Sequence, residues 1–185
     1  MRTDYGKYED QELFLELKGD KSKAEAAFAE IYARYSQRIY AYCLRVTGHP
    51  EEARDIFQET FLKFYSAAQE RKSMENLPAY LLAIARNLCI NYKRNSKINL
   101  TFEDYRYYVH DTGYEQKEML DLIARALETL EFEYREAFIL RQYHGLSYKE
   151  ICQITGDSLS AIKNRVWRAK EKIKEILQPY MQDMS

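Results

Sequence analysis

The chain has 185 residues, and its 28 Lys and Arg nearly balance its 29 Asp and Glu, so the formal net charge is −1. This balance excludes a uniformly basic nucleic-acid binder but allows separate basic and acidic zones. Six Gly and three Pro are too few for a collagen-like or turn-rich β protein. Three cysteines without a CxxC pair, and no apolar signal core or run of ~20 apolar residues, predict a soluble cytoplasmic protein with reduced thiols and no membrane insertion.

Charge is concentrated in zones along the chain. Residues 1–31 carry a net charge of −3 and residues 103–136 one of −6, whereas residues 83–100 and 160–177 carry +4 each. Two basic zones are therefore separated by an acidic one. Charge blocks of this kind often mark interaction surfaces.

The N-terminal half is predicted to contain three long helices. Apolar residues at three- and four-residue steps predict the first over residues 24–44. A Thr-Gly-His-Pro sequence then interrupts the pattern, and Pro50 suits the start of a second helix over residues 51–68. Residues 69–76 are polar and are predicted to form a loop before a third helix over residues 77–95.

Periodicity is lost over residues 96–114, which are the best candidate for a linker. Helical spacing then returns in four segments, residues 119–130, 134–142, 147–155 and 160–177. The predicted fold is all-α. It has two small helical domains, residues 1–97 and 118–185, joined by a linker over residues 98–117.

The last two helices have the features of a helix-turn-helix. Ser147 and Glu150 form a capping box, and Gly156 begins a short turn. At 100° per residue, the following helix buries Ile162, Val166, Ala169 and Ile173. Such a helix can enter the DNA major groove, so the candidate DNA-binding residues on its exposed side are Ser160, Lys163, Asn164, Trp167 and Arg168. The alternative is a solvated cationic helix.

The second predicted helix carries a candidate docking patch opposite its apolar face. This patch consists of Asp55, Gln58, Glu59 and Leu62. An exposed leucine among carboxylates and an amide suits a basic protein partner. The alternative is an ordinary solvated face, because single exposed leucines are common.

The third predicted helix carries a second candidate DNA-binding surface. Asn87, Asn91 and Arg94 share one face, and Lys93 flanks it without any acidic neighbour. Amides and cations suit contact with phosphates and exposed bases, and Tyr92, like Tyr80, offers a ring for an unpaired base. The alternative is a polar face with core tyrosines.

These motifs, in this order, resemble bacterial sigma factors of the extracytoplasmic-function (ECF) group over nearly the whole chain. The opening helix resembles that of sigma region two from Ala27 to Tyr40. Residues 50–65 resemble the segment that binds core polymerase, and residues 77–87 the helix that melts and reads the minus-ten element. Residues 126–138 and 145–151 resemble region four, and residues 165–170 resemble its recognition helix.

The resemblance implies a sigma factor that binds core RNA polymerase and directs promoter-specific transcription initiation. Asp55, Gln58, Glu59 and Leu62 then dock on polymerase. Asn87, Asn91, Tyr92 and Arg94 grip the melted non-template strand, and residues 69–76 capture a flipped base. Lys163, Asn164, Trp167 and Arg168 read the minus-35 element in duplex DNA. The family often has an anti-sigma partner. Tyr80 and Asn91 stand where it often has Trp and Asp.

Two other classes remain as alternatives. A response-regulator-like helix-turn-helix transcription factor would bind duplex DNA without being a polymerase subunit, but it leaves the basic zone at residues 83–100 unexplained. An enzyme finds little support, because His49, His110 and His144 are isolated and no phosphate loop or nucleophile motif is present. The sequence predicts no catalysis, no cofactor and no metal site.

Overall fold

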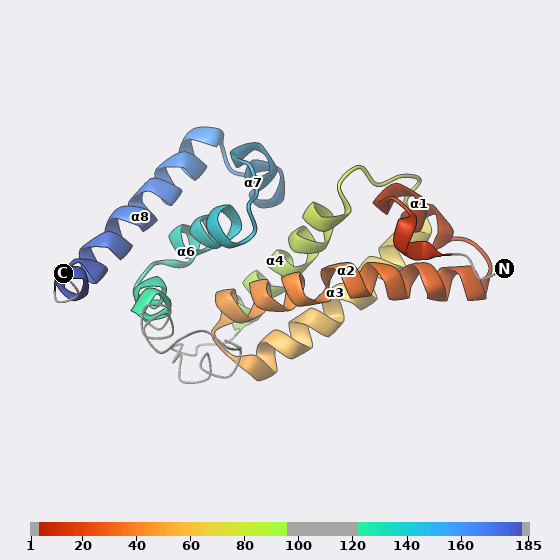
Figure 1. Ribbon diagram of the computed structural model, residues 1–185, viewed down its shortest axis with the longest axis horizontal. Coiled ribbons are helices and arrows are strands. Elements are labelled where there is room, and N and C mark those ends of the chain that lie inside the picture. The colour runs from red at the N-terminus through yellow and green to blue at the C-terminus, as the bar shows by residue number, and fades with distance from the viewer. Residues whose placement is uncertain (1–3, 96–121, 183–185) are drawn as a thin grey trace. The chain divides into compact units, whose positions relative to one another are not determined.

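The computed structural model describes residues 4–95 and 122–182, and every regular element in these ranges is helical (Figure 1). The all-α prediction is therefore confirmed. The described residues divide into two compact units, an N-terminal unit of residues 4–43 and 51–95 and a C-terminal unit of residues 44–50 and 122–182. None of the described helices combines the length and apolar character needed to cross a membrane.

The described part of the N-terminal unit contains one short 3-10 helix and all or most of four α-helices, since the last four residues of α2 and the first of α3 group with the C-terminal unit. They are η1 (Tyr5–Lys7), α1 (Asp10–Glu16), α2 (Lys21–Thr47), α3 (Pro50–Glu70) and α4 (Leu77–Asn95). Helix α2 begins three residues earlier than predicted because Asp20 accepts the Lys23 and Ala24 main-chain N–H groups at 3.1 and 2.9 Å. Helix α3 ends two residues later, which shortens the predicted loop to residues 71–76.

The core of the N-terminal unit is aliphatic and aromatic. Its most buried side chains come from all four α-helices and include Leu13, Phe14, Leu17, Ile31, Ile39, Phe64, Leu81 and Leu82. Three of these come from α1 and its C-cap. A seven-residue helix is marginal on its own, so α1 depends on this burial for its stability.

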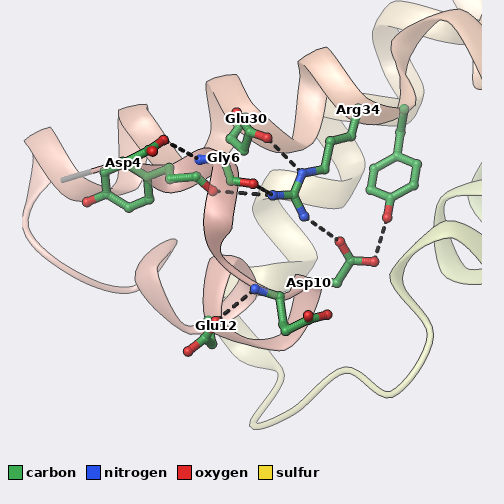
Figure 2. Close-up of polar contacts among 9 residues, drawn as sticks. Asp4, Gly6, Asp10, Glu12, Glu30 and Arg34 are labelled. Atoms are coloured by element: carbon green, nitrogen blue, oxygen red, sulfur yellow. Dashed lines mark hydrogen bonds and ion pairs between the residues drawn. The ribbon is translucent and has the colours of Figure 1, made fainter.

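A polar network fixes η1 and α1 onto α2, and Figure 2 shows its centre at Arg34. The Arg34 guanidinium donates to Glu30 at 2.7 Å, to Asp10 at 3.3 Å and to two main-chain carbonyls of η1 at 3.1 and 3.3 Å. The Tyr35 hydroxyl donates to the same Asp10 carboxylate at 2.5 Å. The hydrogen bond to Glu30 raises the pKa of Arg34, and burial raises that of Tyr35.

The C-terminal unit is built from shorter helices around α8. Residues 122–128 are helical and are followed by α6 (Phe132–Phe138), the π-turn η3 (Ile139–Tyr143), α7 (Tyr148–Thr155) and α8 (Leu159–Gln182). Helix α8 continues five residues past its predicted end and includes Pro179. One core cluster joins α8 to the preceding helices through Ala126, Leu127, Leu130, Ala169 and Ile173.

None of the three cysteines forms a disulfide. Cys43 and Cys89 are buried in the N-terminal unit, with 0% and 2% of their surface exposed. Cys152 lies in α7 of the C-terminal unit and is partly exposed.

Candidate nucleic-acid and protein interfaces

Helix α7 begins at the predicted capping box. The Ser147 hydroxyl accepts the Glu150 main-chain N–H at 3.2 Å, and the Glu150 carboxylate accepts the Ser147 N–H at 2.8 Å. Two N–H groups that the helix itself leaves without acceptors are thus satisfied. Ile151 and Ile154 of α7 are buried, whereas Cys152 is only partly buried.

The turn between α7 and α8 is fixed by local hydrogen bonds. Gly156 adopts a φ of 78°, a left-handed conformation that glycine enters at little cost. The Ser158 hydroxyl then accepts the Ala161 N–H at 3.3 Å and caps α8. Asp157 accepts two hydrogen bonds from the Arg165 guanidinium at 2.5 and 3.2 Å, which ties the turn to the second turn of α8.

Helix α8 has the two faces predicted by its periodicity. Its buried face is confirmed, because Ile162, Val166, Ala169 and Ile173 are at most 7% exposed. All five predicted DNA-binding residues, Ser160, Lys163, Asn164, Trp167 and Arg168, are exposed. Trp167 has 61% of its surface exposed, which is unusual for so large an apolar side chain. The accessible face therefore offers hydroxyl, amide, cationic and indole groups together.

One further cation, Arg141, shares an aromatic partner with Lys163 of this face, and sequence reasoning missed it. The Arg141 guanidinium lies 4.9 Å from the centroid of the Tyr148 ring, and Lys163 Nζ lies 5.9 Å from the same centroid. Arg141 also donates to the Leu146 carbonyl at 2.7 Å. Two cations on one ring at the start of α7 extend the positive surface of α8. No spacing rule could reveal Arg141, because this residue precedes the helix-turn-helix.

The predicted docking patch lies on the exposed side of α3. Asp55, Gln58 and Glu59 are exposed, and Leu62 has 71% of its surface exposed. Glu59 forms an ion pair with Lys63 at 3.2 Å. The opposite side of α3 is buried through Ala53, Ile56, Thr60, Phe61, Phe64 and Ala68. The patch is thus a polar surface with one protruding apolar side chain.

The second candidate surface lies on α4, where Asn87, Asn91 and Arg94 are all exposed. The side chain of Lys93 lies outside the described part of the chain. Tyr92 is half-buried, and its hydroxyl donates a hydrogen bond to Glu52 of α3. This hydrogen bond raises the pKa of Tyr92 to about 12. Tyr92 therefore joins α4 to α3 as well as lying beside the amide face.

The loop before α4 is also ordered by side chains. Asn76 caps the helix by accepting the Ala79 N–H at 3.0 Å. The Arg71 guanidinium lies 4.3 Å from the centroid of the Tyr80 ring, and that ring contacts Phe64 at a centroid distance of 6.4 Å. Arg71, Lys72 and Ser73 are exposed. The loop thus presents cations next to an aromatic ring at the start of the predicted strand-gripping helix.

The described residues contain no group of three or more His, Cys, Asp or Glu side chains that could hold a metal ion. Two family models match the chain. "Sigma-70 region 2" matches residues 31–98, which include the α3 patch and the amide face of α4. "Sigma-70, region 4" matches residues 120–173, which include α7 and the first part of α8.

Relatives match over most of their length. The chain is 29% identical to the RNA polymerase sigma factor YlaC of Bacillus subtilis, over 83% of this chain and 93% of that protein. It is 30% identical to the ECF RNA polymerase sigma factor EcfG of Rhodopseudomonas palustris, over 75% of this chain and 78% of that protein.

The fold agrees with a solved structure. The sigma factor RpoE of Bartonella quintana, solved in complex with the anti-sigma factor NepR, superposes with a TM-score of 0.66 at 23% identity and covers 82% of this chain and 96% of that one. The match to region 2 covers residues 83–98 of the basic zone that a response-regulator-like protein leaves unexplained. The chain belongs to the ECF family of RNA polymerase sigma factors.

Proposed function

We propose that this sigma factor binds core RNA polymerase through the α3 patch and directs initiation at promoters that it recognises with two separate helices. Helix α4 grips the melted non-template strand of the minus-ten element, and α8 reads the minus-35 element in duplex DNA. The protein has no chemistry of its own in this proposal. The observation that carries it is that Leu62, 71% exposed, lies on one face of α3 with the exposed Asp55, Gln58 and Glu59, inside the segment that matches region 2, since burial of this leucine in a partner is favourable.

The charges on these helices support a protein partner for α3 and a DNA partner for α4 and α8. Helix α3 presents Asp55 and Glu59 beside Leu62, which suits a basic protein surface and disfavours DNA. Helices α4 and α8 present amides and cations, which suit phosphates and base edges. A net charge near zero therefore arises from surfaces of opposite sign with different partners.

The partner that holds such a protein inactive is proposed to be an anti-sigma protein. The Bartonella quintana relative was solved with one bound. We further propose the domain limits given by the sequence, with residues 1–97 for polymerase and the minus-ten element, residues 118–185 for the minus-35 element, and residues 98–117 as the linker.

The first test is a pull-down of core RNA polymerase. Wild type is expected to bind, and Gln58→Ala/Leu62→Ala is expected to lose about tenfold or more in affinity, as for residues at the centre of an interface. The matched control is Gln11→Ala/Leu15→Ala, which removes the same two residue types at the same spacing from the exposed side of α1, where Leu15 is 57% exposed. Equal losses in both variants, or no binding by wild type, would refute the docking proposal.

The second test addresses DNA. Transcription of genomic fragments by core polymerase with this protein should start at a defined set of promoters. Trp167 is the single tryptophan of the chain, so its fluorescence reports contact of α8 with duplex DNA. Binding of the minus-35 duplex should change that fluorescence, whereas Asn164→Ala should relax selection at one base pair with a loss of about 1–3 kcal/mol. Promoter-independent transcription would contradict the proposal.

A further inference from the structure

The end of α1 and the loop before α4 hold each other by two hydrogen bonds that run in opposite directions. Gln69 Nε2 at the end of α3 donates to the Leu17 carbonyl at 3.0 Å. Lys18 Nζ donates to the Arg71 carbonyl, the first residue of the loop 71–76. We call Leu17, Lys18, Gln69 and Arg71 the α1–loop clasp. It joins segments that lie more than fifty residues apart.

The residues on the α1 side of the clasp, Leu17 and Lys18, are held by further contacts. Leu17 is the C-cap of α1, where helix carbonyls lack donors within the helix, and the Gln69 amide supplies one. Lys18 follows directly, and a cation is favourable at a helix C-terminus. Its ammonium lies 5.5 Å from the centroid of the Phe14 ring, and both Phe14 and Leu17 are 1% exposed. Lys18 is exposed, yet its ammonium has two partners, the Arg71 carbonyl and the Phe14 ring.

The loop side of the clasp leads directly to the predicted DNA-binding helix. Arg71 offers its carbonyl to Lys18 while its guanidinium lies over the Tyr80 ring in the first turn of α4. Met74 anchors the middle of the loop, because it is 7% exposed. The loop is thus fixed by α1 at one end, by the core at its centre and by the Asn76 cap at the other.

We propose that the clasp positions the loop 71–76 and the Arg71–Tyr80 pair for the unpaired base of the melted minus-ten element. Lys18 and Gln69 are then positioning residues for promoter opening, although Lys18 precedes the residues that match region 2. This inference rests on the proposed function of α4. In this proposal, α1 contributes to the binding of single-stranded DNA by positioning the loop. Its own side chains do not contact the DNA.

The test compares four variants as holoenzymes with core polymerase, on a promoter recovered with wild type. Lys18→Met and Gln69→Glu each remove one donor, and Lys18→Arg retains one. Lys21→Met removes a nearby cation at the start of α2, whose surface contact with Glu25 is 3.9 Å long. We measure affinity for the single-stranded minus-ten oligonucleotide and for the minus-35 duplex. Lys18→Met and Gln69→Glu should each lose about fivefold on the single strand alone, as expected for one net hydrogen bond.

The outcomes separate the inference from the function on which it rests. Wild-type affinity for the single strand in both variants would overturn the positioning role, and so would an equal loss in Lys21→Met. Failure of the wild-type holoenzyme to bind the oligonucleotide would overturn the proposed function and the inference with it. Hydrogen exchange gives a readout without DNA, because amides of residues 71–76 should exchange faster in Lys18→Met and not in Lys18→Arg. Unchanged exchange would also refute the clasp.

Discussion

Arg165 is a cation of the recognition helix that stabilises the fold and does not serve DNA binding. It belongs to the basic zone of α8, yet its guanidinium binds Asp157 through two hydrogen bonds, and both side chains are less than a third exposed. Planar two-point pairing is the strongest geometry that an arginine and a carboxylate can form. Arg165 therefore sets the angle between the turn and α8, whereas Lys163, Asn164 and Arg168 remain available to DNA.

Asp157→Asn should destabilise the C-terminal unit by about 1 kcal/mol, since the pair is partly exposed and solvent weakens it. Urea unfolding of the single variants Asp157→Arg and Arg165→Asp, and of the exchanged pair Asp157→Arg/Arg165→Asp, measures the coupling between the two side chains. The exchanged pair should recover part of the loss. Additive losses in the cycle would show that the two side chains do not interact in solution.

The hydrogen bond from Tyr92 to Glu52 predicts a dependence of stability on alkaline pH. The folded state raises the pKa of Tyr92 from 10.0 to about 12, so it holds the proton more tightly than the unfolded state. The stabilisation is thus complete below pH 10 and is lost as the pH rises toward 12. The free energy of unfolding of wild type should exceed that of Tyr92→Phe by about 1 kcal/mol at pH 8, and the difference should shrink above pH 10. A difference that does not vary with pH would contradict this assignment.

Sequence reasoning succeeds at residue scale where periodicity alone decides. The exposed sides of α3 and α8 follow from 100° per residue, and Leu62 and Trp167 are found where that rule places them. Sequence reasoning fails where a side chain is placed by a contact with a residue far away along the chain. Glu52 lies forty residues from Tyr92, and Lys18 lies 53 residues from Arg71, so no local pattern predicts either contact.

At the scale of elements, the turn after α7 depends on one backbone conformation. Gly156 has a φ of 78°, and a Cβ added there would meet no atom within 4 Å. A substitution therefore costs backbone strain and not a clash. Asparagine tolerates this left-handed conformation better than alanine does.

Gly156→Ala should lower the free energy of unfolding of the C-terminal unit by about 1–2 kcal/mol, and Gly156→Asn by less. Thermal unfolding followed by circular dichroism checks this order. Because no clash is involved, both variants should retain the minus-35 affinity of wild type at low temperature. Equal losses for alanine and asparagine would contradict the strain argument.

The positions of the helix ends show why the helices themselves can be predicted from the sequence, whereas their first and last residues are harder to predict. The sequence predicts the type and order of the long helices, but α2 begins at the cap provided by Asp20, and α3 continues through Glu70. Helix α8 runs through Pro179 although proline commonly ends helices. Each difference arises because caps and packing, rather than periodicity, decide where the last turn lies.

At the scale of the whole molecule, the proposed domain limits predict two separable stabilities. Residues 1–97 and residues 118–185, made as separate fragments, should each unfold cooperatively, as small domains with their own cores do. Circular dichroism melts of the fragments and of the full chain measure this. A fragment that is unfolded on its own at low temperature would contradict the proposed domain limits.

The distribution of the cysteines allows both units to be followed in the unmodified chain. Cys43 and Cys89 are buried in the N-terminal unit, and a thiol reagent reaches them only when that unit opens. Cys152 is partly exposed in α7, so its reaction reports on the C-terminal unit and on anything that covers α7. When reclosing outpaces labelling, the rates at Cys43 and Cys89 give the open fraction of the N-terminal unit, whereas the rate at Cys152 reports how accessible α7 is. Mass spectrometry of the labelled peptides can therefore distinguish a partner that stabilises the N-terminal unit from a partner that covers α7.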